Sequence, residues 1–241
     1  MKPSNITLNR NLKASLLCEA LRLAASGVDT DIALNQLEEL LRNDISGAES
    51  IRKSIRYLRQ IWLLPSPEFL PLRNEALELY KQRPTVECAR KLSFFILMAK
   101  YPFLREVAEV CGRLLRLQGD VKTEQIKRRI MELHGEREPV LRSARYAVSI
   151  MTDLGALSKG ARRGIYCAGA LVTYPDSRFA AFCLEAFMTA VPSKKHFRRT
   201  DLSNHPALFA VDARSLLDTA LTDSRFTISR ESLSEEMISL N

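Results

Sequence analysis

The sequence contains little glycine and no long apolar run. Its 241 residues include nine glycines, and these form no glycine-rich loop of the kind that binds nucleotide phosphates. The longest strongly apolar run, LSFFILMA at 92–99, is far shorter than the roughly 20 residues of a membrane-spanning helix. The N-terminus lacks the apolar core of a signal peptide. These absences argue against nucleotide-binding α/β folds and against a membrane protein, and we expect a cytoplasmic location.

Cysteine and histidine are scarce and widely scattered. The five cysteines are odd in number and include no C-x-x-C pair, which argues against a disulfide framework and a zinc ribbon. The three histidines have no metal-ligand spacing to one another or to a cysteine, and no serine lies in a G-x-S-x-G motif. We therefore expect buried free thiols, no metal or other cofactor, and no enzymatic activity.

The charge balance is strongly positive and uneven along the chain. The formal net charge is +8 and the isoelectric point is about 9.4, which suits a polyanionic partner such as nucleic acid. Residues 121–164 contain ten Lys and Arg against five Asp and Glu, whereas residues 200–241 contain three against seven. We therefore expect the middle of the chain to bind the anionic partner.

Apolar residues recur at helical spacing through most of the chain, which predicts a mainly α-helical fold. The clearest stripe lies on a helix expected over 48–64, where Ile51, Ile55, Leu58 and Trp62 share one face. The opposite side is basic and is either a second surface for phosphates or simply a solvated face. Its four cations are Arg52, Lys53, Arg56 and Arg59.

Residues 121–174 predict a winged helix-turn-helix. A helix over 123–134 and a short turn precede a second helix from about Pro139 to Leu154, which is followed by a basic loop at 158–164 and a β-like run. In such a unit the second helix lies in the DNA major groove and the loop contacts the backbone beside it. The unit could instead dock a protein.

The expected contacts fall into three sets. Small polar and arginine side chains reach base edges, and cations neutralise phosphates. A basic stretch at 192–199 is either a phosphate clamp or an exposed linker. The groove-side set is Arg142, Ser143, Arg145 and Ser149, the phosphate set is Lys127, Arg128, Lys159, Arg162 and Arg163, and the stretch at 192–199 adds Lys194, Lys195, Arg198 and Arg199.

The predicted architecture is a helical N-terminal bundle, a winged helix-turn-helix and a helical C-terminal extension with a short β element. The expected boundaries place the basic N-terminal unit at 1–64, a helical connector at 65–120, the winged unit at 121–175 and the extension at 176–241. The extension could also be a second, degenerate winged unit. Its tail at 230–240 is expected to be a last helix or an arm.

The order of these parts resembles the BrxA-type proteins of BREX phage-defence islands. The stretches that carry the resemblance are GAESIRKSIRYLRQIW (47–62), FFILMAKYPFLREV (94–107) and EPVLRSARYAVSIMTDLGAL (138–157). The resemblance covers organisation over about residues 12–175 rather than a diagnostic motif. It implies a prokaryotic, non-enzymatic DNA-binding component that acts with other defence proteins.

Three functions therefore remain open from the sequence. The first is binding of duplex DNA through the winged unit. The second is a scaffold subunit that uses the winged unit to dock protein, and the third is RNA binding through the arginine-rich helix at 51–62. No heptad seam is long enough to predict a dimer.

Overall fold

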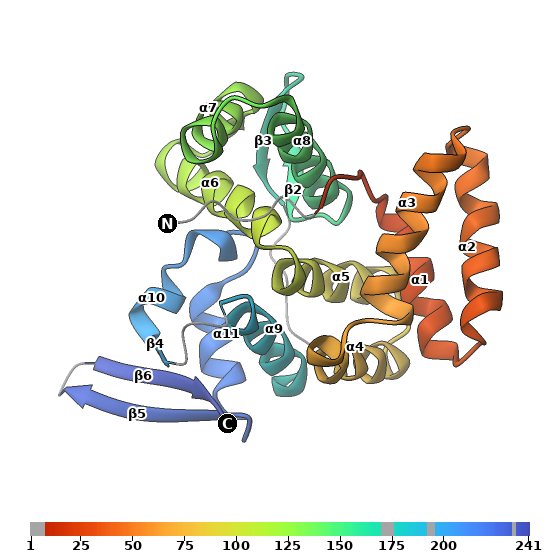
Figure 1. Ribbon diagram of the computed structural model, residues 1–241. Coiled ribbons are helices and arrows are strands. Elements are labelled where there is room, and N and C mark those ends of the chain that lie inside the picture. Colours follow the sequence, from red (N-terminus) through yellow and green to blue (C-terminus); the bar gives the residue numbers. More distant parts are fainter. Residues whose placement is uncertain (1–7, 170–175, 192–195, 233–234) are drawn as a thin grey trace.

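The computed structural model describes residues 8–169, 176–191, 196–232 and 235–241. The prediction of a mainly helical fold is confirmed, and two small antiparallel sheets lie in the second half of the chain (Figure 1). No helix of the described residues is long and apolar enough to cross a membrane. The basic residues Lys194 and Lys195 lie outside the described residues.

Helix α5 is the central helix of the molecule (Figure 1). Its residues from Phe94 to Ala99 are all buried, because it contacts α1, α4, α6 and α9 on different sides. A helix that is apolar all round requires such an environment. The helices of this part are α1 (Ala14–Ser26), α2 (Thr30–Asp44), α3 (Ala48–Leu58), a 3-10 turn (Pro67–Phe69), α4 (Leu70–Gln82) and α5 (Val86–Lys100).

The helix expected over 48–64 is interrupted near its end. Residues Arg59–Leu63 form a π-helical turn, in which the N–H of Leu64 donates to the carbonyl of Arg59 at 2.7 Å. The wider turn leaves Ile61 and Trp62 buried together, at 1% and 0% exposure. Of the predicted apolar stripe, Ile51, Leu58 and Trp62 are buried and Ile55 is half-buried, while the helix changes its period, as single π turns allow.

Residues 102–168 form a compact arrangement that we call the first unit. Its three-stranded sheet has the order β1-β3-β2 with antiparallel pairing, so the last strand of the unit lies in the middle. The predicted boundary at 121 would separate α6 from helices with which α6 packs. The elements are α6 (Pro102–Gln118), β1 (Val121–Lys122), α7 (Thr123–His134), α8 (Glu138–Asp153), β2 (Leu157–Lys159) and β3 (Ile165–Ala168).

Residues 177–240 repeat this plan, and we call them the second unit. The order is again helix, strand, helix, helix, strand, strand, and the sheet order β4-β6-β5 again places the last strand in the middle. The tail expected to be a helix or arm is instead β6, because it pairs with both β4 and β5. The elements are α9 (Ser177–Thr189), β4 (His196–Arg198), α10 (Arg199–Ser203), a 3-10 turn (Pro206–Leu208), α11 (Ala213–Ala220), β5 (Phe226–Ser232) and β6 (Glu235–Leu240).

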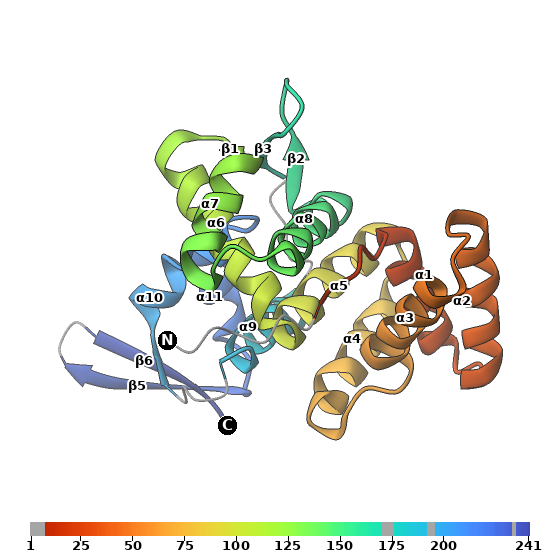
Figure 2. The same ribbon diagram turned by 45° about the horizontal axis from the view of Figure 1, so that its top comes forward.

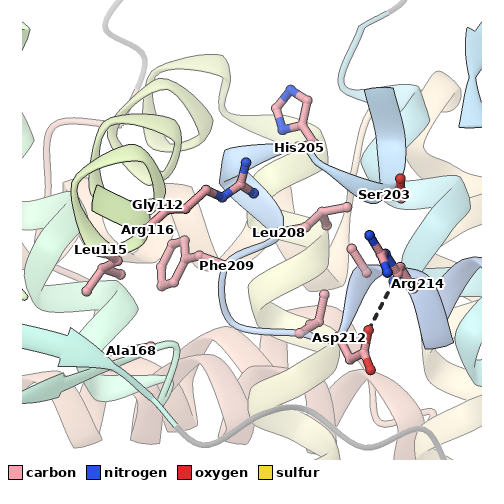
Figure 3. Close-up of a pocket in the computed structure, with 12 residues that line it drawn as sticks. Gly112, Leu115, Arg116, Ala168, Ser203, His205, Leu208, Phe209, Asp212 and Arg214 are labelled. Carbon is pink, nitrogen blue, oxygen red and sulfur yellow. Dashed lines mark hydrogen bonds between the residues drawn. The ribbon is translucent and has the colours of Figure 1, made fainter. Parts of the chain in front are cut away.

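The backbones of the two units pack directly against each other. A Cβ atom added to Gly112 of α6 would lie 1.8 Å from the carbonyl oxygen of Pro206. Both Nη1 and Nη2 of Arg116 donate to the carbonyl oxygen of Asn204 at 3.1 Å. Figure 3 shows this face of α6 beside Phe209. Helix α6 therefore belongs to the core of both units, and the units share one hydrophobic core.

A charged cluster joins the N-terminal helices to the second unit. Arg178 of α9 makes a two-pronged ion pair with Glu75 of α4, with both distances 2.7 Å. Arg225 donates to Glu185 and to Asp223 at 3.0 Å. Burial raises the pKa of Glu185, whereas the hydrogen bond from Arg225 lowers the pKa of Asp223. Burial alone would disfavour the ionised form of Glu185 and Asp223, and the hydrogen bonds from Arg225 stabilise that form.

We expect Arg225→Met to lower the free energy of unfolding by about 2–3 kcal/mol at pH 7. Removing one partner of a buried pair leaves the other charge unpaired, and the loss is reduced here because about a fifth of each side chain is exposed. The folded-state pKa of Asp223 is depressed, so its stabilisation is lost as the pH falls through that pKa. The difference between variant and wild type should therefore shrink below about pH 4.

Urea denaturation at several pH values measures this difference. Arg42→Met is the control, because Arg42 forms an exposed ion pair with Glu38 on α2 and such pairs contribute little. A loss for Arg225→Met no larger than that of the control would contradict the role assigned to the cluster.

Candidate nucleic-acid interface

Helix α8 has one buried and one exposed face. Val140, Ala144, Ala147 and Met151 recur at helical spacing and are buried, and Pro139 lies in the first turn, where its missing N–H has no partner to lose. The opposite face carries Arg142, Arg145 and Tyr146, with Ser149 one turn further along. Arg142 and Arg145 are exposed, and Ser149 is half-buried. This face is where the sequence predicts contacts to bases.

Ser143 corrects that prediction. Its side chain is 1% exposed, and its hydroxyl is buried without a hydrogen-bond partner among the described residues. It lies three residues after Val140 and four before Ala147, so the helical period places it on the buried face. A polar side chain alone predicted an outward position, whereas its spacing to the apolar residues would have placed it correctly.

The loop between β2 and β3 projects from the body of the molecule (Figure 2). Lys159, Arg162 and Arg163 on this hairpin are all exposed. Gly164 closes the loop with a φ of +80°, a left-handed conformation that favours glycine. Its carbonyl oxygen accepts from the N–H of Thr123 at 2.8 Å and from the Thr123 hydroxyl at 3.1 Å. The base of the loop is therefore anchored to the start of α7.

Ion pairing divides the cations of the first unit into two groups. Arg142 and the three loop cations form no ion pair with any carboxylate in the described part of the chain. Four cations of α7 and α8 pair with three acids of their own helices, so together they keep a net charge of only about +1. The pairs are Lys127 with Glu124 at 2.8 Å, Arg128 with Glu132 at 3.2 Å, Arg129 with Glu132 at 2.9 Å and Arg145 with Glu138 at 2.9 Å.

Lys122 is a further cation of this surface that the sequence did not single out. It is exposed on β1, and its Cα lies opposite Ile165 of β3 in the sheet. No carboxylate of the described ranges pairs with it. The available signal was the alternation of buried Val121 and exposed Lys122, but a strand of two residues is too short for a pattern to reveal it.

The basic face of α3 lies apart from α8 and the loop (Figures 1 and 2). Arg52 and Lys53 both pair with Glu49, in the case of Lys53 at 2.9 Å. The guanidinium of Arg56 lies 5.8 Å from the ring centroid of Tyr57, and Arg59 is exposed. The four residues thus form a separate surface whose charge Glu49 partly neutralises.

Arg198 and Arg199, two cations of the predicted phosphate clamp, are both held by acids of the second unit. Arg198 pairs with Glu235 at 2.8 Å. Arg199 pairs with Glu236 at 2.6 Å and also with Asp218. These contacts tie β4 and α10 to β6 and α11, so both cations hold the second unit together. Their acidic partners lie about 20 to 40 residues away in the chain, which local reading of the sequence does not reveal.

Most of the cysteine thiols and the side chain of His134 are buried in the core. Cys88, Cys111 and Cys183 are buried free thiols, and the other two cysteines are half-buried and free. Burial raises the pKa of Cys111 to about 12, so its reactive thiolate form is suppressed at neutral pH. His134 Nε2 lies 2.6 Å from Glu106 Oε2 inside the first unit. Within the described ranges, no three His, Cys, Asp or Glu residues are grouped to hold a metal ion.

Helix α8, the β2–β3 loop and Lys122 together carry five exposed cations that pair with no carboxylate among the described residues: Lys122, Arg142, Lys159, Arg162 and Arg163. Comparison of the chain with family models, curated proteins and solved structures finds no match in any of the three.

Proposed function

We propose that the first unit is a winged helix-turn-helix that binds duplex DNA. In this arrangement α6, α7 and α8 are its three helices, α8 lies in the major groove, and the β2–β3 loop is the wing on the adjacent backbone. The order of elements and the sheet order β1-β3-β2 support the proposal. The observation that carries it is a set of exposed cations on α8 and the loop that pair with no carboxylate in the described part of the chain: Arg142, Lys159, Arg162 and Arg163.

The proposed contacts follow from the chemistry of these side chains. Guanidinium groups pair with the O6 and N7 atoms of guanine, so Arg142 and Arg145 would read base edges. Arg145 would first leave Glu138, at small cost because the pair is half exposed. The three loop cations and Lys122 would bind phosphates, which fix orientation without reading sequence. Lys127 and Arg128, which the sequence predicts as further phosphate contacts, are each held by a carboxylate and are left out of the proposed contacts.

The second unit is proposed to brace the first rather than to bind DNA. Its helix in the position of α8 is α11, which has eight residues. The cations Arg198 and Arg199 are held by acids of the same unit. This unit is a candidate surface for a protein partner, because its segment 200–241 is acidic. The resemblance to BrxA-type defence proteins stays a prediction, and with it a non-enzymatic role beside other defence proteins.

The first experiment is a salt titration of DNA binding. Fluorescence anisotropy of a labelled random-sequence duplex is measured with the purified chain across a series of salt concentrations. Four phosphate contacts predict a slope of log affinity against log salt of about −3.6, since each contributes about −0.9 in duplex DNA. A duplex RNA of the same sequence is the matched control, because its deep, narrow major groove does not admit α8.

The outcomes separate the three candidate functions. Binding of DNA with a steep slope and weaker binding of RNA would support the proposal. Equal or tighter binding of RNA would favour RNA recognition. No binding of either duplex at low salt would reject nucleic-acid binding and leave the scaffold role.

A further inference from the structure

An apolar groove lies between α6 and α7, the two helices of the first unit that are not proposed to enter DNA. Its volume is about 390 Å³, and its floor is formed by Val110 and Leu114. Leu117 and Leu133 stand at its edges with 81% and 50% of their surface exposed. Exposed apolar side chains that gather beside an apolar groove form a contiguous patch, and such patches mark interaction sites. Its charged rim is Arg113, Arg129 and Glu132. Both arginines are paired, but each shares its acid with a second arginine, Glu109 with Arg105 and Glu132 with Arg128, so cations outnumber acids around the groove.

Helix α2 carries the second exposed apolar patch. Ile32 is 51% exposed and Leu40 is 42% exposed, and with Gln36 they lie at positions i, i+4 and i+8 on one face. Exposed Glu39 adjoins Leu40 on the same side. Helix α2 as a whole is acidic, with Asp31, Glu38, Glu39 and Asp44 against Arg42. The patch therefore has the form of an amphipathic helix with an acidic border, which fits a groove with a basic rim.

The two patches lie on opposite sides of α5. Figures 1 and 2 both place α2 at one extreme and α6 and α7 on the other side of α5. One chain cannot bring them together, but two copies can. We propose that α2 of one copy docks in the α6–α7 groove of the next, with Ile32 and Leu40 between Leu117 and Leu133 and with Glu39 near Arg113 or Arg129.

Such a contact joins different surfaces of two identical chains and leaves a free patch at each end. A contact of this type continues as an open chain of copies unless the rotation closes a ring. If the first unit binds DNA as proposed above, neighbouring copies on one duplex would bind cooperatively. The self-association does not depend on DNA and is testable without it.

Sedimentation velocity of the full chain without DNA tests the contact. We expect the fraction of species larger than a dimer to rise with concentration over roughly 10 to 500 μM, since a contact made by a few exposed apolar side chains is small and weak. Leu117→Glu blocks the groove and Ile32→Lys blocks the helix, so each variant alone is expected to stay monomeric. Val86→Glu is the control, because Val86 is 63% exposed on the first turn of α5, outside both patches.

An equimolar mixture of the two variants provides the decisive result. The intact α2 of the Leu117→Glu chain still fits the intact groove of the Ile32→Lys chain, so the mixture is expected to form a dimer and to stop there. A wild-type chain that stays monomeric throughout would overturn the proposal. So would a wild-type dimer that Ile32→Lys leaves intact, because that would indicate a symmetric contact through the groove alone.

Discussion

Replacing Lys159, Arg162 and Arg163 together with alanine is expected to weaken DNA binding about a hundredfold at 0.15 M salt. Each phosphate contact in duplex DNA contributes about 0.9 to the salt slope, which corresponds to about a fivefold gain in affinity at this concentration relative to 1 M salt. Three lost contacts therefore multiply to about a hundredfold. The slope itself should fall by about 2.7, and this change is independent of the absolute affinity.

A charge-matched variant shows whether the loss of DNA affinity comes from the loop itself or from the lower net charge. Replacing Lys127, Arg128 and Arg129 with alanine removes the same three charges from the same unit. Because these cations already pair with Glu124 and Glu132, we expect less than about a threefold loss and a slope changed by less than about 1. Equal losses in the two variants would show that only overall charge matters and would reject the loop as the wing.

Gly112→Ala is expected to destabilise the fold by about 3 kcal/mol or more. The new Cβ would lie 1.8 Å from the carbonyl oxygen and 2.7 Å from the carbonyl carbon of Pro206. These are backbone atoms, so no side chain can rotate away, and α6 must separate from the turn Pro206–Leu208. Overpacking of a well-packed core costs about 1–3 kcal/mol, and more where the neighbour cannot move.

Thermal unfolding measures this effect. For a chain of this size a loss of about 3 kcal/mol corresponds to a fall in Tm of about 6–12 °C. Gly47→Ala is the control: the nearest atom to its new Cβ lies 3.6 Å away, and we expect a change below about 1 kcal/mol at this helix N-cap. A Tm for Gly112→Ala equal to that of the control would show that the two units do not meet at this contact.

The helices were predictable because their signals are local. Apolar residues three and four apart define the buried faces of α3, α7 and α8, and the side chain of Asp29 caps α2 by accepting from the N–H groups of Asp31 and Ile32. The basic loop at 158–164 was predictable for the same reason, since glycines and cations adjacent in the chain are also adjacent in space.

The strands were less predictable because they are short and pair over long distances. β1 has two residues and β2 has three, too few for an alternating pattern to appear. β6 was expected to be a helix or an arm, and it becomes a strand because β4, some 40 residues earlier, pairs with it. No periodicity within the tail contains that information.

Three features of this protein follow from the sequence alone: its positive net charge, its mainly helical fold, and a basic loop after a helix with one apolar face. Only the tertiary structure decided which cations of that protein keep an unpaired charge. Arg198 and Arg199 meet acids from β6 and α11, whereas Arg162 and Arg163 meet none in the described part of the chain. The physical reason is that the charge of a side chain is local to its residue, whereas its neutralisation depends on which distant carboxylates the fold brings within about 4 Å.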